Sequence, residues 1–231
     1  MKVFIDRQKV NAHATWSNVA SVGGLMLLLA SVVLPLFLPS WANFAYVFMI
    51  VGMGSAMIGI YFANRWVRKP RPEESLAKAL KSFDDHYRLY HYPSLPCDHL
   101  LLTPNGVVIL EVFNLSGSFS YKQGRWKEAM TIGRALRYIV EEHIGDPVLT
   151  ARQVEKELDR RFKKEFGSEV TIPIKSVVAF THAAVDLDVD ESPIPICKAD
   201  KLKKQVALNA PRLTTEQYEK IARLLESLTT Q

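Results

Sequence analysis

The chain has 231 residues, with 29 Lys and Arg against 24 Asp and Glu, and a net charge of +5. This length allows one sizeable domain plus an extra segment, and the mild positive charge permits contact with phosphates or anionic lipid without requiring it. The only two cysteines, Cys97 and Cys197, are far apart in the sequence. The composition therefore excludes a disulfide-stapled fold and favours a reducing compartment.

The first 63 residues predict two membrane-spanning helices. After a short polar segment, 1–18, no charged residue occurs in 19–38 or in 44–63. Each run of about 20 residues is long enough to cross a hydrocarbon core as a helix. Residues 39–43 contain Pro, Ser, Trp and Asn, which predicts the tight turn of a transmembrane hairpin. A cleaved signal peptide is disfavoured because the first apolar run is too long and a second run follows at once.

Positive charges occur at the two outer ends of this hairpin and not in its turn. By the positive-inside rule, both termini and the soluble domain are predicted to be cytoplasmic. The basic residues that follow the second run are also suited to attract anionic lipid. The flanking cations are Lys2, Arg7 and Lys9 before the first run, and Arg65, Arg68, Lys69 and Arg71 after the second.

Small residues in the second apolar run occur at helical spacing, as the pairs Gly52 and Ala56, and Ser55 and Gly59. Such faces allow two helix backbones to approach closely. We expect this face to pack against the first run, and a homodimer contact is the alternative.

Residues 64–72 form a basic linker that contains Pro70 and Pro72, and residues 73–231 form the predicted cytoplasmic domain. A helix is expected over 73–83, because Leu76, Leu80 and Phe83 share one face. A strand is expected over 87–92, where aromatic residues are frequent.

The second half of the domain alternates predicted helices and strands. Asp146 and Pro147 are typical of a helix start, and that helix is expected to end at Gly167. The apolar run 174–180 predicts a strand buried on both faces, and 185–189 predicts an exposed edge strand. A short strand over 194–197 and a last helix over 211–228, capped at Thr214 or Thr215, complete the prediction.

The stretch from Asp98 to Asn114 predicts a β-hairpin at the centre of the domain. Two apolar runs flank the turn Thr103-Pro104-Asn105-Gly106, and Asn-Gly is a strong hairpin signal. Asp98 comes before the first strand and Glu111 comes at the end of the second. The two carboxylates are therefore expected at the same end of the sheet, as a divalent-metal site or the remnant of one.

These residues resemble the core of the nuclease-related domain (NERD), a branch of the restriction-endonuclease-like fold. Asp98, Pro104, Gly106 and Glu111 match its pattern of an acid, a strand, Pro-x-Gly, a second strand and Glu-x-Lys. The resemblance covers about residues 72 to 205 and implies an α/β fold with a mixed sheet flanked by helices. It further implies Mg²⁺ held by Asp98 and Glu111, with Glu74 as the acid from the first helix.

The lysine of that pattern is replaced by Phe113, which carries no charge and cannot contact phosphate. A two-residue step along a strand places Phe113 on the same face as Glu111. Lys122, on the next predicted strand, would substitute only if it projected into the same site. The sequence therefore predicts that nuclease chemistry is lost or altered.

Two further groups of residues, one of His and Cys and one of Arg and Lys, are candidate binding sites. His86, His91, Cys97 and His99 have wide, irregular spacings unlike those of structural zinc sites, so zinc is not expected, and His99 is expected to be an exposed or capped strand residue. Arg125, Lys127, Arg134 and Arg137 could form a phosphate-facing patch with Trp126 stacking on a base. The favoured alternative is a solvated charged face with Trp126 in the core.

Three functional hypotheses follow. The first is a membrane-anchored nucleic-acid-interacting module of nuclease ancestry, with doubtful catalysis. The second is a non-catalytic membrane scaffold that binds a protein partner, with homo-oligomers allowed. The third is an active Mg²⁺-dependent nuclease that uses a displaced lysine.

Overall fold

The computed structural model describes residues 1–131, 138, 143–167 and 171–229 of the chain. The chain divides into two compact units. One unit contains residues 1–6, 72–129 and 144–231, and the other contains residues 7–71 and 130–143. Most of the segment 129–143 lies outside the described residues.

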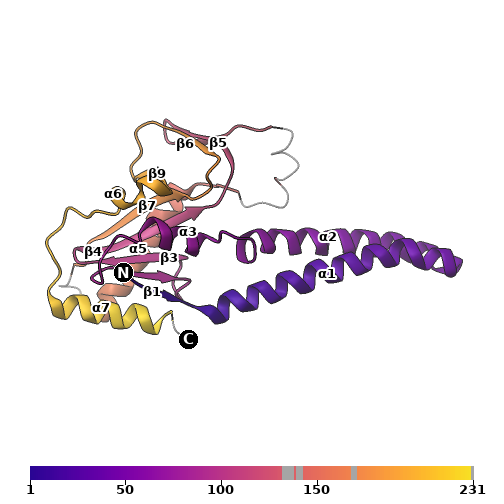
Figure 1. Ribbon diagram of the computed structural model, residues 1–231, viewed down its shortest axis with the longest axis horizontal. Helices are drawn as coiled ribbons and strands as arrows, with labels where there is room; N and C mark the ends of the chain where they lie inside the picture. The colour runs from indigo at the N-terminus through magenta and orange to yellow at the C-terminus, as the bar shows by residue number, and fades with distance from the viewer. Residues whose placement is uncertain (132–137, 139–142, 168–170, 230–231) are drawn as a thin grey trace. The chain divides into compact units, whose positions relative to one another are not determined.

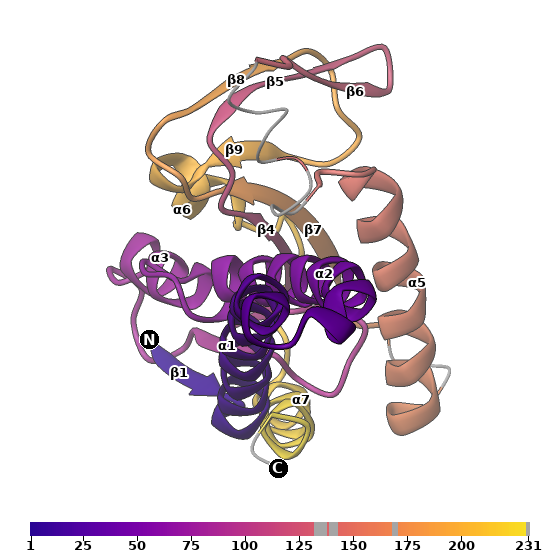
Figure 2. The same cartoon turned by 90° about the vertical axis from the view of Figure 1, so that its right-hand side faces the viewer.

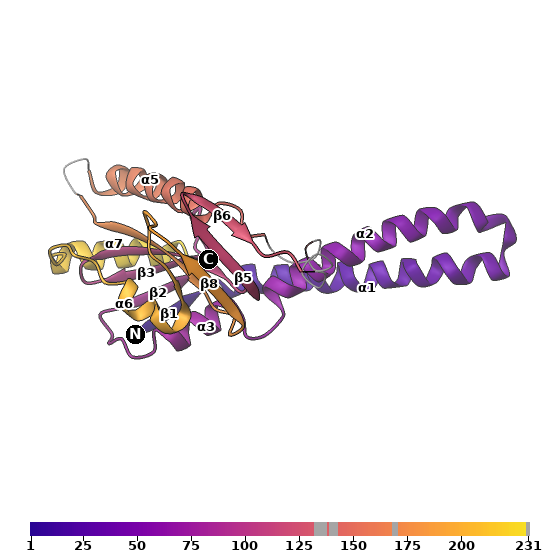
Figure 3. The same ribbon diagram turned by 90° about the horizontal axis from the view of Figure 1, so that it is seen from above.

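The helical unit consists of α1 (Arg7–Phe37), the 3₁₀ turn η1 (Pro39–Trp41) and α2 (Ala42–Trp66), which form an antiparallel hairpin (Figures 1 and 3). By length and composition, both helices are apolar enough to cross a membrane. Helix α1 begins at Arg7, well before the apolar run at 19, because residues 7–22 contain no Gly or Pro to interrupt it.

Small residues bring the two helices of the hairpin into close contact. A Cβ atom added at Gly24 would lie 2.5 Å from the backbone nitrogen of Ala56. The Ser17 hydroxyl donates to the Gly59 carbonyl at 3.0 Å, and the Ser55 hydroxyl donates to the Ala20 carbonyl at 2.9 Å. The prediction that the small-residue face packs against the first apolar run is confirmed, and a homodimer face stays a prediction.

The other unit is built on a mixed six-stranded sheet in the order β1-β2-β3-β4-β7-β9. Strands β1, β4, β7 and β9 of this sheet are labelled in Figure 2. The antiparallel strands β2, β3 and β4 form its centre, and β1, β7 and β9 add in parallel at the two sides. A separate three-stranded sheet has the order β6-β5-β8. The strands are β1 (Lys2–Ile5), β2 (Arg88–His91), β3 (His99–Thr103), β4 (Gly106–Phe113), β5 (Gly117–Lys122), β6 (Arg125–Glu128), β7 (Ile174–Phe180), β8 (Val185–Val189) and β9 (Ile196–Lys198).

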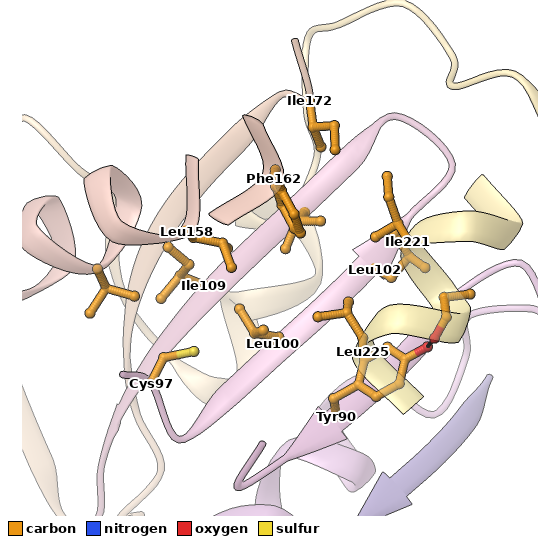
Figure 4. Close-up of a cluster of buried hydrophobic side chains, with 13 residues drawn as sticks. Tyr90, Cys97, Leu100, Leu102, Ile109, Leu158, Phe162, Ile172, Ile221 and Leu225 are labelled. Atoms are coloured by element: carbon orange, nitrogen blue, oxygen red, sulfur yellow. Dashed lines mark hydrogen bonds between the residues drawn. The ribbon is translucent and has the colours of Figure 1, made fainter. Parts of the chain in front are cut away.

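Helices cover both faces of the large sheet. Helices α5 (Pro147–Phe166) and α7 (Thr215–Ser227) cover one face, where Leu158, Phe162 and Leu225 pack on Leu100 and Ile109 (Figure 4). Helix α3 (Pro72–Ala79), the 3₁₀ turn η2 (Ala199–Lys201) and helix α6 (Leu202–Gln205) belong to the opposite face. The expected α/β architecture, a mixed sheet flanked by helices, is confirmed.

Local capping signals fix where the two long helices of this unit begin. The Asp146 carboxylate accepts from the Leu149 amide at 3.0 Å, and Pro147 is the first residue of α5. Thr214 and Gln217 form a reciprocal capping box at the start of α7. Both predicted starts are confirmed, because a cap depends only on neighbouring residues.

Two elements differ from the sequence prediction. Strand β1 lies within the segment 1–18, which was expected to be only a short terminus, and it pairs in parallel with β2 from Lys2 opposite Arg88 to Ile5 opposite His91. A strand of four residues has too little alternation to be recognised without its partner. Helix α3 ends at Ala79, before the expected end at Phe83, whose ring stacks on that of Tyr87 at 4.2 Å.

Candidate functional site

The central hairpin of β3 and β4 has an acid near the same end of each strand. Asp98 directly precedes β3, and Glu111 lies in β4 two residues beyond Ile109, which pairs with Leu100 at the end of the register. Both acids are half-buried, and Glu111 lies on the same face of β4 as Ile109, the sheet face that packs against α5 and α7. The convergence of the two carboxylates in one site stays a prediction, because the register of the hairpin ends before Asp98.

Phe113 follows on the same face as Glu111 and belongs to the hydrophobic core. Its side chain lies opposite Phe180 of β7, and the ring centroids are 5.6 Å apart. The residue is 8% exposed. An aromatic ring, packed into a cluster with Phe119 and Phe180, thus occupies the position that carries lysine in the nuclease pattern.

Lys122 lies elsewhere, at the last position of β5 in the three-stranded sheet. Its ammonium nitrogen is 2.6 Å from a carboxylate oxygen of Asp188 on β8, and this hydrogen bond raises the pKa of Lys122. The structure pairs Lys122 with Asp188 and does not bring it beside Asp98 and Glu111. Its role as a displaced catalytic lysine stays a prediction without geometric support.

Of the two acids in the first turn of α3, Glu73 is the more deeply buried. Glu73 is 4% exposed and accepts a hydrogen bond from the Tyr92 hydroxyl at 2.9 Å. The Tyr92 amide in turn donates to the Asp98 carbonyl at 2.6 Å. The expected acid, Glu74, is half-buried. Sequence reasoning missed Glu73, because two adjacent glutamates at a helix start give no sign of which one turns inward.

A buried histidine pair lies on the other face of the sheet at the same end. The Nδ1 atoms of His91 and His99 are 2.9 Å apart, and the two residues are 0% and 3% exposed. The expectation of an exposed His99 is therefore wrong. Burial lowers the pKa of His91 well below its usual value, and the neighbouring His99 acts in the same direction.

The donor atoms at this end of the sheet do not complete a metal site. Among the residues that the structure describes, no group of three or more His, Cys, Asp or Glu side chains is placed to hold a metal ion. Asp98 and Glu111 alone could supply only part of a Mg²⁺ shell, with the remainder coming from water or phosphate. A cation held by these two carboxylates would therefore need further ligands from outside this part of the chain.

Trp126 packs against the aromatic cluster of the three-stranded sheet. Its half-buried ring lies 5.1 Å from Tyr121 and 6.1 Å from Phe180. Arg125 and Lys127, the neighbouring residues on β6, are exposed, as the favoured alternative predicted. The proposed patch residues 134 and 137 lie outside the described residues.

The two parts of the sequence differ sharply in charge. Residues 72–231 contain 22 basic and 23 acidic residues, whereas residues 1–71 contain 7 basic residues and 1 acidic residue. The domain is therefore close to neutral, and the positive charge of the chain belongs to the hairpin and its flanks. Non-specific nucleic-acid binding depends on positive charge, and the net charge of the domain does not supply it.

Comparison with known proteins finds one similarity for this domain. The family model of the nuclease-related domain (NERD) matches residues 70–181. This segment contains the Asp98 to Asn114 hairpin and strands β2 to β7, and the match supports the NERD family and a nuclease ancestry for the domain. No curated protein and no solved structure matches the chain.

Proposed function

We propose that this protein is a membrane-anchored binding module of nuclease ancestry that does not cleave nucleic acid by the Glu-x-Lys chemistry of its family. The observation that carries the proposal is the buried ring of Phe113 beside Glu111, because a phenyl group can neither position water nor offset the charge of a phosphate. The third hypothesis, an active nuclease with a displaced lysine, loses support because Lys122 is paired with Asp188.

The anchor in this proposal is the hairpin of α1 and α2. Strand β1, which directly precedes α1, pairs with β2 of the domain. Residues 2–5 and the domain must then lie on the same side of the membrane, which requires an even number of crossings between them. Two spans satisfy this requirement, and the flanking cations favour the cytoplasmic side.

We favour a protein as the partner of the domain. A groove runs between α5 and α7, with two cavities of about 750 and 640 Å³ that share Glu165 and Leu224 as lining residues. Its walls combine apolar residues such as Phe166 and Ile221 with charges of both signs. A near-neutral domain with a mixed groove suits a protein surface better than a polyanion.

Nucleic acid is the second candidate, and the specific observation in its favour is the retained acid pair on a NERD-type hairpin. Under this alternative, binding would need a divalent cation between the carboxylates and phosphate. It would therefore be lost in Asp98→Asn and in Glu111→Gln.

The deciding experiment uses the full chain in detergent micelles, with labelled single-stranded and plasmid DNA and RNA, in Mg²⁺, Mn²⁺ or EDTA. The proposal predicts intact substrates under all conditions. Cleavage that requires Mg²⁺ and disappears in Glu111→Gln would overturn it. Metal-dependent binding without cleavage would select nucleic acid over a protein as the partner.

A further inference from the structure

We propose that the basic end of the hairpin binds the headgroups of anionic phospholipids, through Arg65, Arg68 and Lys69. This inference rests on the proposed membrane anchoring and adds a ligand class to it. The chemistry is that of a phosphate diester with a net negative charge, recognised by guanidinium and ammonium groups at the depth of the headgroups.

The hairpin carries a concentrated positive charge. Residues 7–71 contain six cations and no Asp or Glu. All six lie outside the apolar runs, and the antiparallel packing of α1 and α2 places them at one end of the hairpin. The six cations are Arg7, Lys9, Arg65, Arg68, Lys69 and Arg71.

Aromatic contacts hold the basic end of the hairpin together. The His13 ring of α1 stacks on the Trp66 ring of α2 with centroids 4.4 Å apart, and it lies 6.0 Å from Phe62. The guanidinium of Arg65 lies 5.7 Å from the centre of the Trp66 ring. The end of α2 is thus fixed against α1, so that the cations which follow Trp66 start from a defined position.

The lengths of the two helices indicate how deep the cations lie in the membrane. Helix α2 continues past the apolar run for only three residues, Asn64–Trp66, which is about 5 Å at 1.5 Å per residue. Each headgroup layer is roughly 5 to 8 Å thick, so Arg65, Arg68 and Lys69 fall at the level of the lipid phosphates. Helix α1 extends for 12 residues before its apolar run, about 18 Å, which carries Arg7 and Lys9 further into water.

Exposure supports the same assignment. Arg68 and Lys69 are exposed and Arg65 is half-buried against Trp66. Trp16, on α1 three positions before the apolar run, is 70% exposed, as expected for a side chain that sits in the interface. The cations and this indole together form a surface suited to the boundary between acyl chains and anionic headgroups.

The test is tryptophan quenching in vesicles that contain the full chain. A Trp41→Phe background removes the reporter at the opposite end of the hairpin and leaves Trp16 and Trp66 at the basic end. Brominated phosphatidylcholine and brominated phosphatidylglycerol are compared at equal mole fractions. Trp126 lies in the domain core and serves as the unquenched reference.

We expect the anionic lipid to quench at a severalfold lower mole fraction than the zwitterionic lipid, and the preference to fall at high salt. Each cation near the surface contributes up to about a fivefold preference, so Arg68→Gln with Lys69→Gln should abolish most of the difference between the two lipids. The matched control, Lys163→Gln with Lys164→Gln on α5, removes the same charge from exposed positions outside the hairpin and should leave the preference unchanged.

The outcomes separate this inference from the anchoring on which it rests. Equal quenching by both lipids would overturn the headgroup assignment and leave the anchor intact. No quenching by either lipid would overturn the anchor itself. Equal quenching by both lipids, with oligonucleotide binding that is lost in the Arg68→Gln and Lys69→Gln variant, would reassign these cations to nucleic acid.

Discussion

The rings of Phe113 and Phe180 stack with centroids 5.6 Å apart, and their planes are inclined by 30°. The two residues are direct neighbours on the parallel strands β4 and β7. The strand that carries Glu111 therefore continues into the hydrophobic core two residues later. The nuclease pattern would require a charged group at this buried position.

Replacing Phe113 with lysine should not restore cleavage. The ammonium would enter a cluster of aromatic rings, and we expect a loss of about 2–4 kcal/mol in the free energy of unfolding, from the lost packing and the buried charge. The measurement is thermal unfolding together with a plasmid cleavage assay in Mg²⁺. Phe113→Leu is the control and should cost about 1 kcal/mol. A stable Phe113→Lys protein that cleaves DNA would contradict the interpretation that position 113 is a core position without a catalytic role.

The hairpin offers a matched pair of adjacent glycines. Gly24→Ala should loosen the hairpin, because the new methyl group would meet the backbone of Gly52 and Ala56. Gly23→Ala should be neutral or slightly stabilising, because Gly23 has no atom within 4 Å of an added Cβ and alanine favours the helix. Thermal unfolding of the full chain in detergent, followed by circular dichroism, compares the two. Equal shifts would show that the helices do not pack through Gly24.

The hairpin at Asp98 to Asn114 shows how far local sequence determines this fold. Turn chemistry at Asn105 and Gly106 fixes the register of β3 and β4, from Leu100 opposite Ile109 to Thr103 opposite Gly106. Helix starts at Asp146 and Thr214 were predictable for the same reason, since each depends on a few adjacent residues. Phe113 was also recognisable as a departure from the pattern.

Features that depend on distant contacts were not predictable. Strand β1 exists because β2 provides its hydrogen-bonding partner, and the two lie more than 80 residues apart in sequence. Glu73 is inward-facing because Tyr92 lies opposite it, and Lys122 is paired because β8 adds beside β5. Sequence periodicity contains no information about such pairings.

The hydrogen bond between Tyr92 and Glu73 predicts a stabilising role for both residues. Tyr92→Phe would remove a donor from a carboxylate that is 4% exposed, and we expect a cost of about 1–3 kcal/mol in the free energy of unfolding. Glu73→Gln keeps an acceptor and should cost less. Hydrogen exchange of the Tyr92 amide, which donates to the Asp98 carbonyl, provides a local readout and should accelerate in Tyr92→Phe.

The buried histidine pair predicts a loss of stability in mild acid. Burial beside His99 lowers the pKa of His91 in the folded chain, whereas an unfolded histidine titrates near 6.5. The unfolded chain therefore binds an additional proton below about pH 6.5. The stability is fully present above that pH and falls as the pH drops towards the folded pKa, with a slope of up to about 1.4 kcal/mol per pH unit for one proton.

Chemical unfolding of the full chain in detergent between pH 7.5 and 5.5, followed by the fluorescence of Trp126 in a background that lacks the other tryptophans, measures this slope. His91→Gln should flatten it, because the glutamine side chain does not titrate. His86→Gln is the matched control, since His86 is exposed, and it should keep the slope of the parent chain. If His91→Gln loses stability with falling pH as steeply as the parent, carboxylates rather than the histidine pair govern the acid sensitivity of the domain.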